Sequence, residues 1–141
     1  MILLDSDHVS VLADGRDGRH SQLATRLTAV TEQVALPVVV LEEHLRGWLA
    51  EIRRARDPLA LIVPYDHLVR LLAYFSAWNV ANWTEDSAQI FSDLRRHRIR
   101  IGTQDLRIAS ISLSLGARLL SANLHDFRQV PGLLVEDWLH A

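Results

Sequence analysis

The sequence lacks cysteine, lysine, long hydrophobic runs and any excess of positive charge. The absence of cysteine is compatible with a reducing cytoplasm. The apolar start Met1–Leu4 meets Asp5 too soon for a signal peptide or a membrane span, and the other apolar runs have strand length. The formal charge of −2 gives no global basic character of the kind that indicates nucleic-acid binding. We therefore predict a soluble cytoplasmic protein that does not enter the membrane.

The length and hydrophobic content of the chain suit a single domain. The chain has 141 residues, of which 49% are hydrophobic, so it can bury a core of its own. A domain typically takes roughly 100–200 residues. No repeat, low-complexity tract or linker interrupts the sequence. We therefore predict one domain over residues 1–141.

Short apolar runs alternate along the chain with stretches of helical periodicity. The runs predicted to form strands are Ile2–Leu4, Leu36–Val40, Val80–Trp83, Arg118–Ala122 and Leu133–Val135. Helices are predicted after the Asp14–Gly18 turn, from Leu41, over Pro58–Trp78 with a potential break at Pro64, after an N-cap at Thr84, and over Asp105–Leu115 before Gly116. This alternation is typical of the α/β class, with helices on both sides of a central parallel sheet of about four or five strands.

Acidic side chains recur where the predicted strands end. Asp5 follows the first strand, Glu43 lies just past the second, and Asp105 opens a helix. Asn123 and Asp126 follow the strand that ends near residue 122. Functional groups of parallel sheets gather beyond the carboxyl ends of the strands. We therefore expect these side chains to meet at one edge of the sheet.

A cluster of carboxylates at one edge favours a divalent cation. Carboxylates held together repel one another, and a hard cation such as Mg²⁺ supplies the missing positive charge. Such an ion can activate water and brace a phosphate, and it reverses the local field so that an acidic protein can act on a polyanion. Taken singly, each acid also fits a structural role: Asp105 as a helix N-cap, and Glu42 and Glu43 as solvated acids of a first turn.

Five short motifs occur in order along nearly the whole chain. They are Leu3-Leu4-Asp5-Ser6-Asp7, Glu43-His44-Leu45-Arg46-Gly47, the stretch from Ile101 to Ala109, the stretch from Leu120 to Phe127, and Val130-Pro131-Gly132-Leu133 with Glu136-Asp137-Trp138. In residue types and separations they resemble the PIN domain and, within it, the VapC-like toxins. The resemblance implies a three-layer α/β/α PIN-like fold. It also implies a metal-dependent endoribonuclease that hydrolyses RNA phosphodiester bonds as the toxin of a VapBC-like toxin–antitoxin pair.

The resemblance assigns roles to the acidic residues. Asp5, Glu43 and Asp105 would ligate Mg²⁺ or Mn²⁺. Asn123 and Asp126 fall in the fourth motif. The resemblance leaves open which of the two contacts the metal, and Asp126 would complete its shell or orient the attacking water. All five residues are therefore candidate metal ligands, and the four acids are the candidate catalytic residues.

The resemblance also implies partners. These are an RNA substrate, a VapB-like antitoxin that wraps the protein and blocks the site, and a second copy of the chain. The apolar segment Leu59–Trp78 would lie either at that dimer interface or in the core.

The chain departs from the family pattern at two places. Asp7 replaces the usual Asn and adds a negative charge beside the site, and Pro37 with Val40 or Leu41 fills the neighbourhood of a Ser and a Thr on the second strand. No proposed ligand is lost. The changes leave room for an alternative, a catalytically degenerate PIN domain that acts as a binding or assembly module.

A phosphatase of the haloacid dehalogenase type is a further alternative, because Asp5-Ser6-Asp7 after a hydrophobic strand has the shape of its nucleophile motif. That chemistry, like that of receiver domains, relies on a lysine to hold the phosphate. All 15 residues counted as Lys or Arg are arginines, which nearly excludes it. The basic run from Arg95 to Arg100 allows two interpretations, stabilisation by a helix dipole or contact with phosphates.

Overall fold

The structure, a computed structural model, describes residues 1–140. Its centre is a parallel sheet of five strands in the order β3-β2-β1-β4-β5. The strands are β1 (Ile2–Leu4), β2 (Val34–Pro37), β3 (Asn79–Ala81), β4 (Arg118–Leu120) and β5 (Leu134–Glu136). The helices are α1 (Ser6–Ala13), α2 (His20–Ala29), α3 (Val38–Arg54), α4 (Ile62–Ser76), α5 (Glu85–Arg96), α6 (Thr103–Ser114) and α7 (Leu124–Phe127), with a 3₁₀ turn at Pro58–Leu61. The predicted α/β class and parallel sheet are confirmed.

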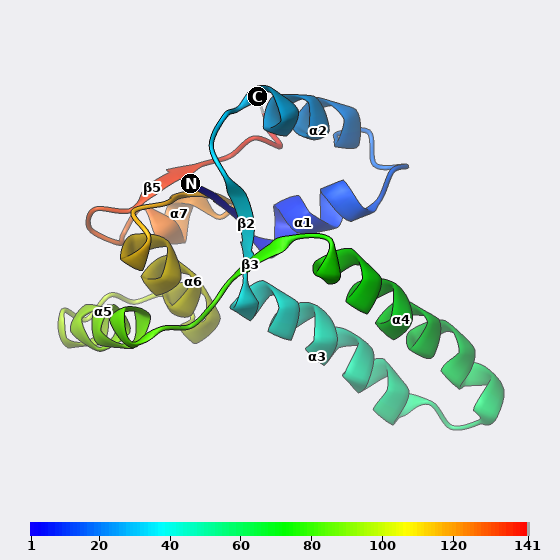
Figure 1. The fold of residues 1–141 in the computed structure, drawn as a ribbon. Helices are drawn as coiled ribbons and strands as arrows, with labels where there is room; N and C mark the ends of the chain where they lie inside the picture. The colour runs from blue at the N-terminus through cyan, green and yellow to red at the C-terminus, as the bar shows by residue number, and fades with distance from the viewer. Residues whose placement is uncertain (141) are drawn as a thin grey trace.

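The strand order reverses at β1. The chain runs from β1 outward through β2 to β3, then crosses back to β4 and β5 on the other side of β1. Because parallel crossovers are right-handed, this reversal puts α1–α4 on one face of the sheet and α5–α7 on the other. Figure 1 shows the helices on both sides. The carboxyl ends of β1 and β4 therefore border the crevice in which α/β proteins place their sites.

The central strands form the core. Ile2, Leu3 and Leu4 of β1 and Leu119 and Leu120 of β4 are fully buried. Strands covered by helices on both faces must be apolar throughout, which is why their sequences show no alternation. Both strands are short, so the first residue after each already lies at the sheet edge.

Several predicted bounds were wrong, and two helices were not predicted. The apolar run predicted as a strand at Leu36–Val40 divides, because β2 ends at Pro37 and α3 begins at Val38. Proline lacks the N–H that a central strand needs, so the ladder stops there. Helix α1 was not predicted, and the turn predicted after Asn123 contains the short helix α7.

Three local predictions concerned a helix cap, a helix end and a break within a helix. Thr84 caps α5, with its side chain and that of Ser87 exchanging capping bonds. Gly116, just past α6, has φ 59°, a conformation that glycine adopts without strain. Pro64 does not break the helix, because it lies in the first turn of α4, where its missing N–H costs nothing.

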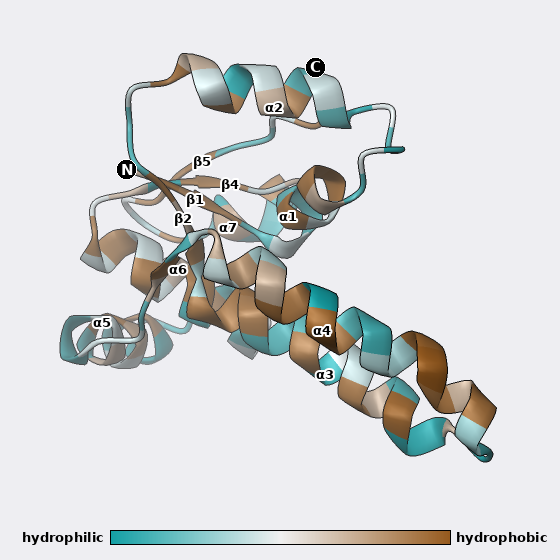
Figure 2. Cartoon of the chain, turned by 45° about the vertical axis from the view of Figure 1, so that its right-hand side comes forward, coloured by the Kyte–Doolittle hydropathy of each residue, from teal (hydrophilic) through white to brown (hydrophobic). Residues whose placement is uncertain are grey.

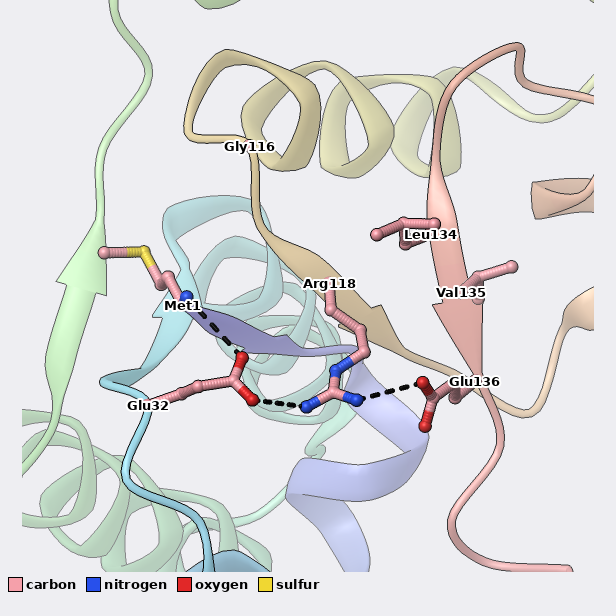
Figure 3. A pocket seen from close by; sticks show the side chains of 7 residues that line it. All are labelled: Met1, Glu32, Gly116, Arg118, Leu134, Val135 and Glu136. Atoms are coloured by element: carbon pink, nitrogen blue, oxygen red, sulfur yellow. Dashed lines mark hydrogen bonds and ion pairs between the residues drawn. The ribbon is translucent and has the colours of Figure 1, made fainter.

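An ion network links the segment before β2, the start of β4 and the end of β5 (Figure 3). Arg118 donates to Glu32 at 2.6 Å and to Glu136 at 3.0 Å. Its guanidinium also lies 5.6 Å from the ring of Trp138, and Arg26 lies 4.1 Å from the same ring. A pocket of about 310 Å³ beside this network is lined by Glu32, Arg118 and Glu136 together with Met1, Gly116, Leu134 and Val135. We assign it a structural role.

Helices α3 and α4 form a hairpin that projects from the body (Figures 1 and 2). For Leu59–Trp78 we predicted a place either in the core or at a dimer interface. Leu71 and Phe75 are buried in the core, whereas Val69 and Leu72 are 69% and 74% exposed. By length and composition the stretch Pro58–Ser76 is also able to span a membrane. Length and composition alone do not identify a membrane helix.

Candidate active site

Asp5 is the residue at which β1 ends and α1 begins. It caps α1, and its Oδ1 accepts the backbone N–H of Ser6 at 2.8 Å. Its Oδ2 accepts the hydroxyl of Ser121, the first residue after β4, at 2.7 Å. Asp5 is only 7% exposed. The residue therefore combines a capping role with a buried charge at the switch point of the sheet.

The surroundings of Asp5 disfavour its charge. Burial raises the pKa of its carboxyl from 3.8 to about 7, Asp7 adds to this rise, and Asp105 adds a smaller part. The hydrogen bonds from Ser121 and Ser6 act in the opposite direction. Asp5 is therefore partly protonated at neutral pH, a state that a nearby cation would reverse.

Glu43 reaches the same edge from α3. Its Oε1 is buried and, within residues 1–140, has no hydrogen-bond partner, and the same holds for the Ser6 hydroxyl oxygen. Burial raises the pKa of Glu43, and the charges of Asp105 and Glu42 add to the rise, while nearby Ser6 and Arg46 lower it. A buried carboxylate oxygen without a donor is costly, so this atom is a natural position for a cation.

Asp105, Asn123 and Asp126 are joined by one amide group. The Nδ2 of Asn123 lies 3.0 Å from Asp105 Oδ2 and 3.1 Å from Asp126 Oδ2. Since both neighbours are carboxylates, the amide must present its NH₂ group to them, which leaves its carbonyl oxygen free. Burial raises the pKa of Asp105, the Asn123 bond opposes this, and the charges of Asp126 and Asp7 add to it.

A second layer of polar contacts links α3 to α6 beside the acids. Glu42 accepts Gln104 Nε2 at 3.0 Å and Arg46 at 2.7 Å, and Gln104 in turn accepts Arg107 at 2.7 Å. The bond from Gln104 is the main reason why the pKa of Glu42 is lowered. These contacts set the position of α3, which carries Glu43, relative to α6, which carries Asp105.

Asp5, Glu43 and Asp105 are the residues best placed to hold a divalent cation. Asp126 and the carbonyl oxygen of Asn123 lie beside them. Within residues 1–140 no three Asp, Glu or His side chains already stand together as a metal-binding group. The donor set fits Mg²⁺ or Mn²⁺, because it offers carboxylate oxygens, one of them buried and unpartnered, and one carboxyl whose pKa burial raises to about 7.

Comparison with curated proteins gives short matches, and no protein-family model matches the chain. Ribonuclease VapC1 of Rickettsia felis is 44% identical over 48 residues, which are 34% of this chain and 36% of the relative. Ribonuclease VapC2 of the same species is 32% identical over 50 residues, 36% of this chain and 37% of that relative. The matches thus span little more than a third of each relative.

Solved structures match over nearly the whole chain. VapBC-1 from nontypeable Haemophilus influenzae aligns with a TM-score of 0.76 at 21% identity, covering 98% of each chain. VapBC2 from Rickettsia felis, bound to a DNA fragment from its promoter, aligns with a TM-score of 0.75 at 20% identity over 98% of this chain and 99% of that one. This chain has a VapC-like fold. At these identities the structural likeness is one of fold.

The departures of this VapC-like chain from the family pattern have structural explanations. Asp7 has both oxygens engaged, one by His8 and one by the backbone N–H of Ala122 at 2.8 Å. Pro37 ends β2. Val40 is fully buried in the core. The second-strand neighbourhood therefore serves packing, whereas Asp7 belongs to the acidic edge.

Ser121 is the site residue that sequence analysis missed. It is fully buried, donates to Asp5, and accepts the backbone N–H of Asn123 at 3.0 Å. It thereby links the turn after β4 to the turn after β1. Its position directly after a buried strand, within the fourth motif, could have identified Ser121 as a candidate. The sequence does not show which carboxylate its hydroxyl contacts.

The basic run from Arg95 to Arg100 had two interpretations, stabilisation by a helix dipole and contact with phosphates, and its arginines differ in which one they fit. Arg96 pairs with Asp93, and Arg95 lies 5.6 Å from the ring of Phe91, both within α5. These two arginines occupy the last turn of the helix, where the dipole favours cations. Arg98 and Arg100 are exposed in the segment that leads to α6 and Asp105. Phosphate contact stays a prediction for these two.

A groove of about 660 Å³ lies between α1, α3 and α4 of the VapC-like chain. Its walls include the stacked rings of Trp48 and His67, whose centroids are 3.9 Å apart. His44, next to Glu43 in the chain, and Tyr74 each place a buried polar atom here without a partner among the described residues. Burial lowers the pKa of His44. The groove therefore combines aromatic walls and charged side chains, among them Asp14 and Arg70, with unused hydrogen-bonding groups.

Proposed function

We propose that this chain is a metal-dependent endoribonuclease of the VapC toxin type. The observation that carries the proposal is the placement of Asp5, Glu43 and Asp105 on three separate elements, near enough for the charge of Asp105 to raise the pKa values of Asp5 and Glu43. The unpartnered Oε1 of Glu43 and the raised pKa of Asp5 support a cation there. The matches to two proteins named ribonuclease VapC support RNA as the substrate.

Different residues of the chain have different proposed roles in RNA hydrolysis. Asp5, Glu43 and Asp105 would hold the Mg²⁺ or Mn²⁺ ion, and Asn123 keeps Asp105 and Asp126 at a fixed separation through its two N–H groups. Asp126 would orient the attacking water. A bound ion would supply the positive charge that polarises the phosphate and lowers the pKa of that water. Arg46 and Arg107, held beside the site by Glu42 and Gln104, supply the cationic groups that a phosphate chain requires.

Purified protein is expected to cut RNA only in the presence of a divalent cation. The measurement is cleavage of total RNA and of a defined single-stranded oligonucleotide with Mg²⁺, with Mn²⁺ and with EDTA. Cutting with either cation and none with EDTA supports the proposal. Folded protein, free of antitoxin, that leaves RNA intact under every condition contradicts it and favours the binding-module alternative.

A small antitoxin is the proposed protein partner, since matching structures are VapBC complexes. We place it in the groove between α1, α3 and α4. There a bound chain would cover the aromatic walls and satisfy His44 Nε2 and the Tyr74 hydroxyl, both buried without partners. Because His44 follows Glu43 in α3, a chain in this groove lies next to the acidic edge, and it would hinder RNA from reaching the site.

A second copy of the chain is the proposed occupant of the exposed face of α4. Ile62, Tyr65, Val69 and Leu72 are exposed apolar residues along that helix. Their spacings of three, four and three residues are symmetric about His67. Two antiparallel copies of α4 would therefore set Ile62 against Leu72 and Tyr65 against Val69, the self-matching arrangement that a two-fold interface requires.

The substitution Val69→Arg is expected to convert a dimer into a monomer. It puts two like charges near the centre of the symmetric stripe, where burial leaves them unpaired. Sedimentation velocity at micromolar concentration measures the change. Leu134→Arg, a matched change at an exposed leucine of β5, is expected to leave the dimer intact. A wild-type monomer at these concentrations contradicts the assignment.

A further inference from the structure

His8 is a fully buried histidine that the proposed chemistry does not use. It lies in α1, three residues after Asp5, and its side chain is 0% exposed. One ring nitrogen, Nδ1, lies 2.5 Å from Asp7 Oδ1. The other, Nε2, accepts the backbone N–H of Trp138 at 3.1 Å. A buried histidine with both nitrogens engaged has a defined task in the structure.

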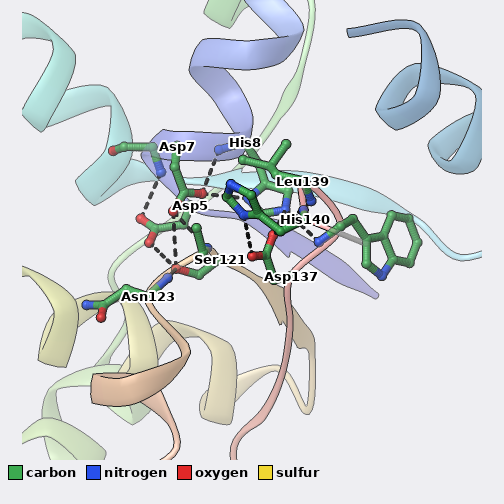
Figure 4. A network of polar contacts seen from close by, with 11 residues as sticks. Asp5, Asp7, His8, Ser121, Asn123, Asp137, Leu139 and His140 are labelled. Atoms are coloured by element: carbon green, nitrogen blue, oxygen red, sulfur yellow. Dashed lines mark hydrogen bonds and ion pairs between the residues drawn. The ribbon is translucent and has the colours of Figure 1, made fainter. Parts of the chain in front are cut away.

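The contact with Trp138 decides which tautomer His8 adopts. A backbone N–H only donates, so Nε2 must be the unprotonated nitrogen. The proton of the neutral ring then lies on Nδ1, where it can only be donated to Asp7 (Figure 4). Because the peptide group cannot reverse its polarity, the Trp138 backbone fixes the direction of the whole chain of hydrogen bonds.

Asp7 is held from its other side as well. Its Oδ2 accepts the backbone N–H of Ala122 at 2.8 Å, and the Ser121 hydroxyl lies 3.5 Å away. Its Oδ1 also accepts the N–H of His8 at 2.6 Å. Both oxygens are therefore occupied by donors, and the negative charge is held in one place, beside the Asp5 carboxylate that shares Ser121 with it.

The far end of this chain of contacts is itself rigid. The Trp138 ring lies 4.1 Å from the Arg26 guanidinium and 5.6 Å from that of Arg118, and its Nε1 donates to Glu136 at 2.7 Å. Asp137 accepts the backbone N–H of Leu139 at 2.8 Å. The Trp138 N–H is thus presented to His8 from a fixed segment, 130 residues along the chain from the ring it meets.

We propose that His8 is a positioning residue, which uses the backbone of Trp138 to hold the Asp7 carboxylate as an outer-shell partner of the metal site at Asp5. The inference rests on the proposed function, since it needs a cation at that site. The positioning role of His8 also explains why Asp7 stands where the family usually has Asn. An asparagine there would turn its NH₂ group toward either Ala122 N–H or His8 Nδ1–H, so the aspartate and the histidine depend on each other.

Two substitutions of His8 separate positioning from packing. In His8→Asn the amide reaches the place of Nδ1 and still donates to Asp7, whereas in His8→Gln it reaches the place of Nε2 and meets Trp138. Removing outer-shell partners costs metal affinity about 10–100-fold. We therefore expect His8→Gln to weaken Mn²⁺ binding about tenfold and His8→Asn to stay within about threefold of wild type. Titration calorimetry measures the Mn²⁺ Kd, with circular dichroism to establish that each variant is folded.

A double-mutant cycle with Asp7→Asn makes the test independent of general destabilisation. If His8 acts through Asp7, His8→Gln adds little further loss of Mn²⁺ affinity once Asp7 is neutral. An equal loss in both backgrounds, or a wild-type Kd in folded His8→Gln, overturns the proposal.

The tautomer provides a readout that needs no metal. Nitrogen-15 spectra of labelled histidine are expected to show His8 protonated at Nδ1 and unprotonated at Nε2. The opposite tautomer overturns the inference whatever the metal result. A wild-type protein with the expected tautomer that neither binds Mn²⁺ nor cuts RNA overturns the proposed function, and with it the outer-shell role.

Discussion

The substitution Asp105→Asn is expected to lower RNA cleavage by about a thousandfold or more while leaving the protein folded. Charge stabilisation by a bound ion contributes several kcal/mol to a transition state, and each 1.36 kcal/mol is a factor of ten in rate. Asparagine has nearly the same shape and still offers an oxygen to Asn123, which donates to Asp105 at 3.0 Å. Initial rates with saturating Mn²⁺, measured on single-stranded RNA, give the comparison. Asp5→Asn is expected to behave in the same way.

The control is Asp86→Asn, the same chemical change at an exposed acid in the first turn of α5. We expect it to cleave RNA at the wild-type rate. A wild-type rate in folded Asp105→Asn would remove that residue from the site. A loss that extends equally to Asp86→Asn would indicate a general effect on the protein.

In the absence of metal, the stability of the wild-type protein relative to Asp5→Asn is expected to fall as pH rises from about 4 to about 7. Burial raises the pKa of Asp5 to about 7, from 3.8 in the unfolded chain. Between these values the native state binds the proton more tightly than the unfolded state, so raising the pH favours unfolding. Above pH 7 the difference stays constant. Glu43 and Asp105, whose pKa values are also raised, shift wild-type stability in the same direction.

Urea unfolding in EDTA at pH 5 and at pH 8 measures this difference. We expect Asp5→Asn to gain about 1–3 kcal/mol relative to wild type between the two conditions, below the limit of about 4 kcal/mol that three pKa units would allow. Taking the difference between the two proteins cancels the acids whose pKa values are lowered, such as Asp17 and Glu136. An unchanged difference at the two pH values contradicts the raised pKa.

The same linkage predicts how Mn²⁺ acts on stability. Metal ligands bind as carboxylates, so the ion must displace the proton that Asp5 holds below pH 7. The rise in melting temperature on adding Mn²⁺ is therefore expected to be larger at pH 8 than at pH 6, and to be lost in Asp5→Asn. This comparison follows the ion at its site without requiring any RNA.

Local burial patterns were sufficient to predict the sheet. The strand at Ile2–Leu4 is confirmed with its bounds, because a parallel strand covered on both faces has to be apolar throughout. The same pattern failed at Leu36–Val40. The first turn of α3 is buried too, and a short apolar run does not distinguish a buried strand from the start of a buried helix. Helix α1 was not predicted because Asp5 was interpreted only as the end of a strand. It is also the N-cap of α1.

The sequence by itself determined the set of candidate acids, since strand ends and motif spacing select Asp5, Glu43 and Asp105. In the fold Asp5 directly follows β1, whereas Glu43 and Asp105 lie in α3 and α6, and a cation site shared by the three stays a prediction. The tertiary structure alone decided their partners. Ser121 meets Asp5 because β1 and β4 pair in register, with Leu4 opposite Leu120. The contact between His8 and the Trp138 backbone likewise joins segments that are far apart in the chain. The periodicity of a sequence indicates which residues are buried. A long-range hydrogen bond depends on which distant donor or acceptor the fold brings close to a given side chain, and periodicity does not indicate that.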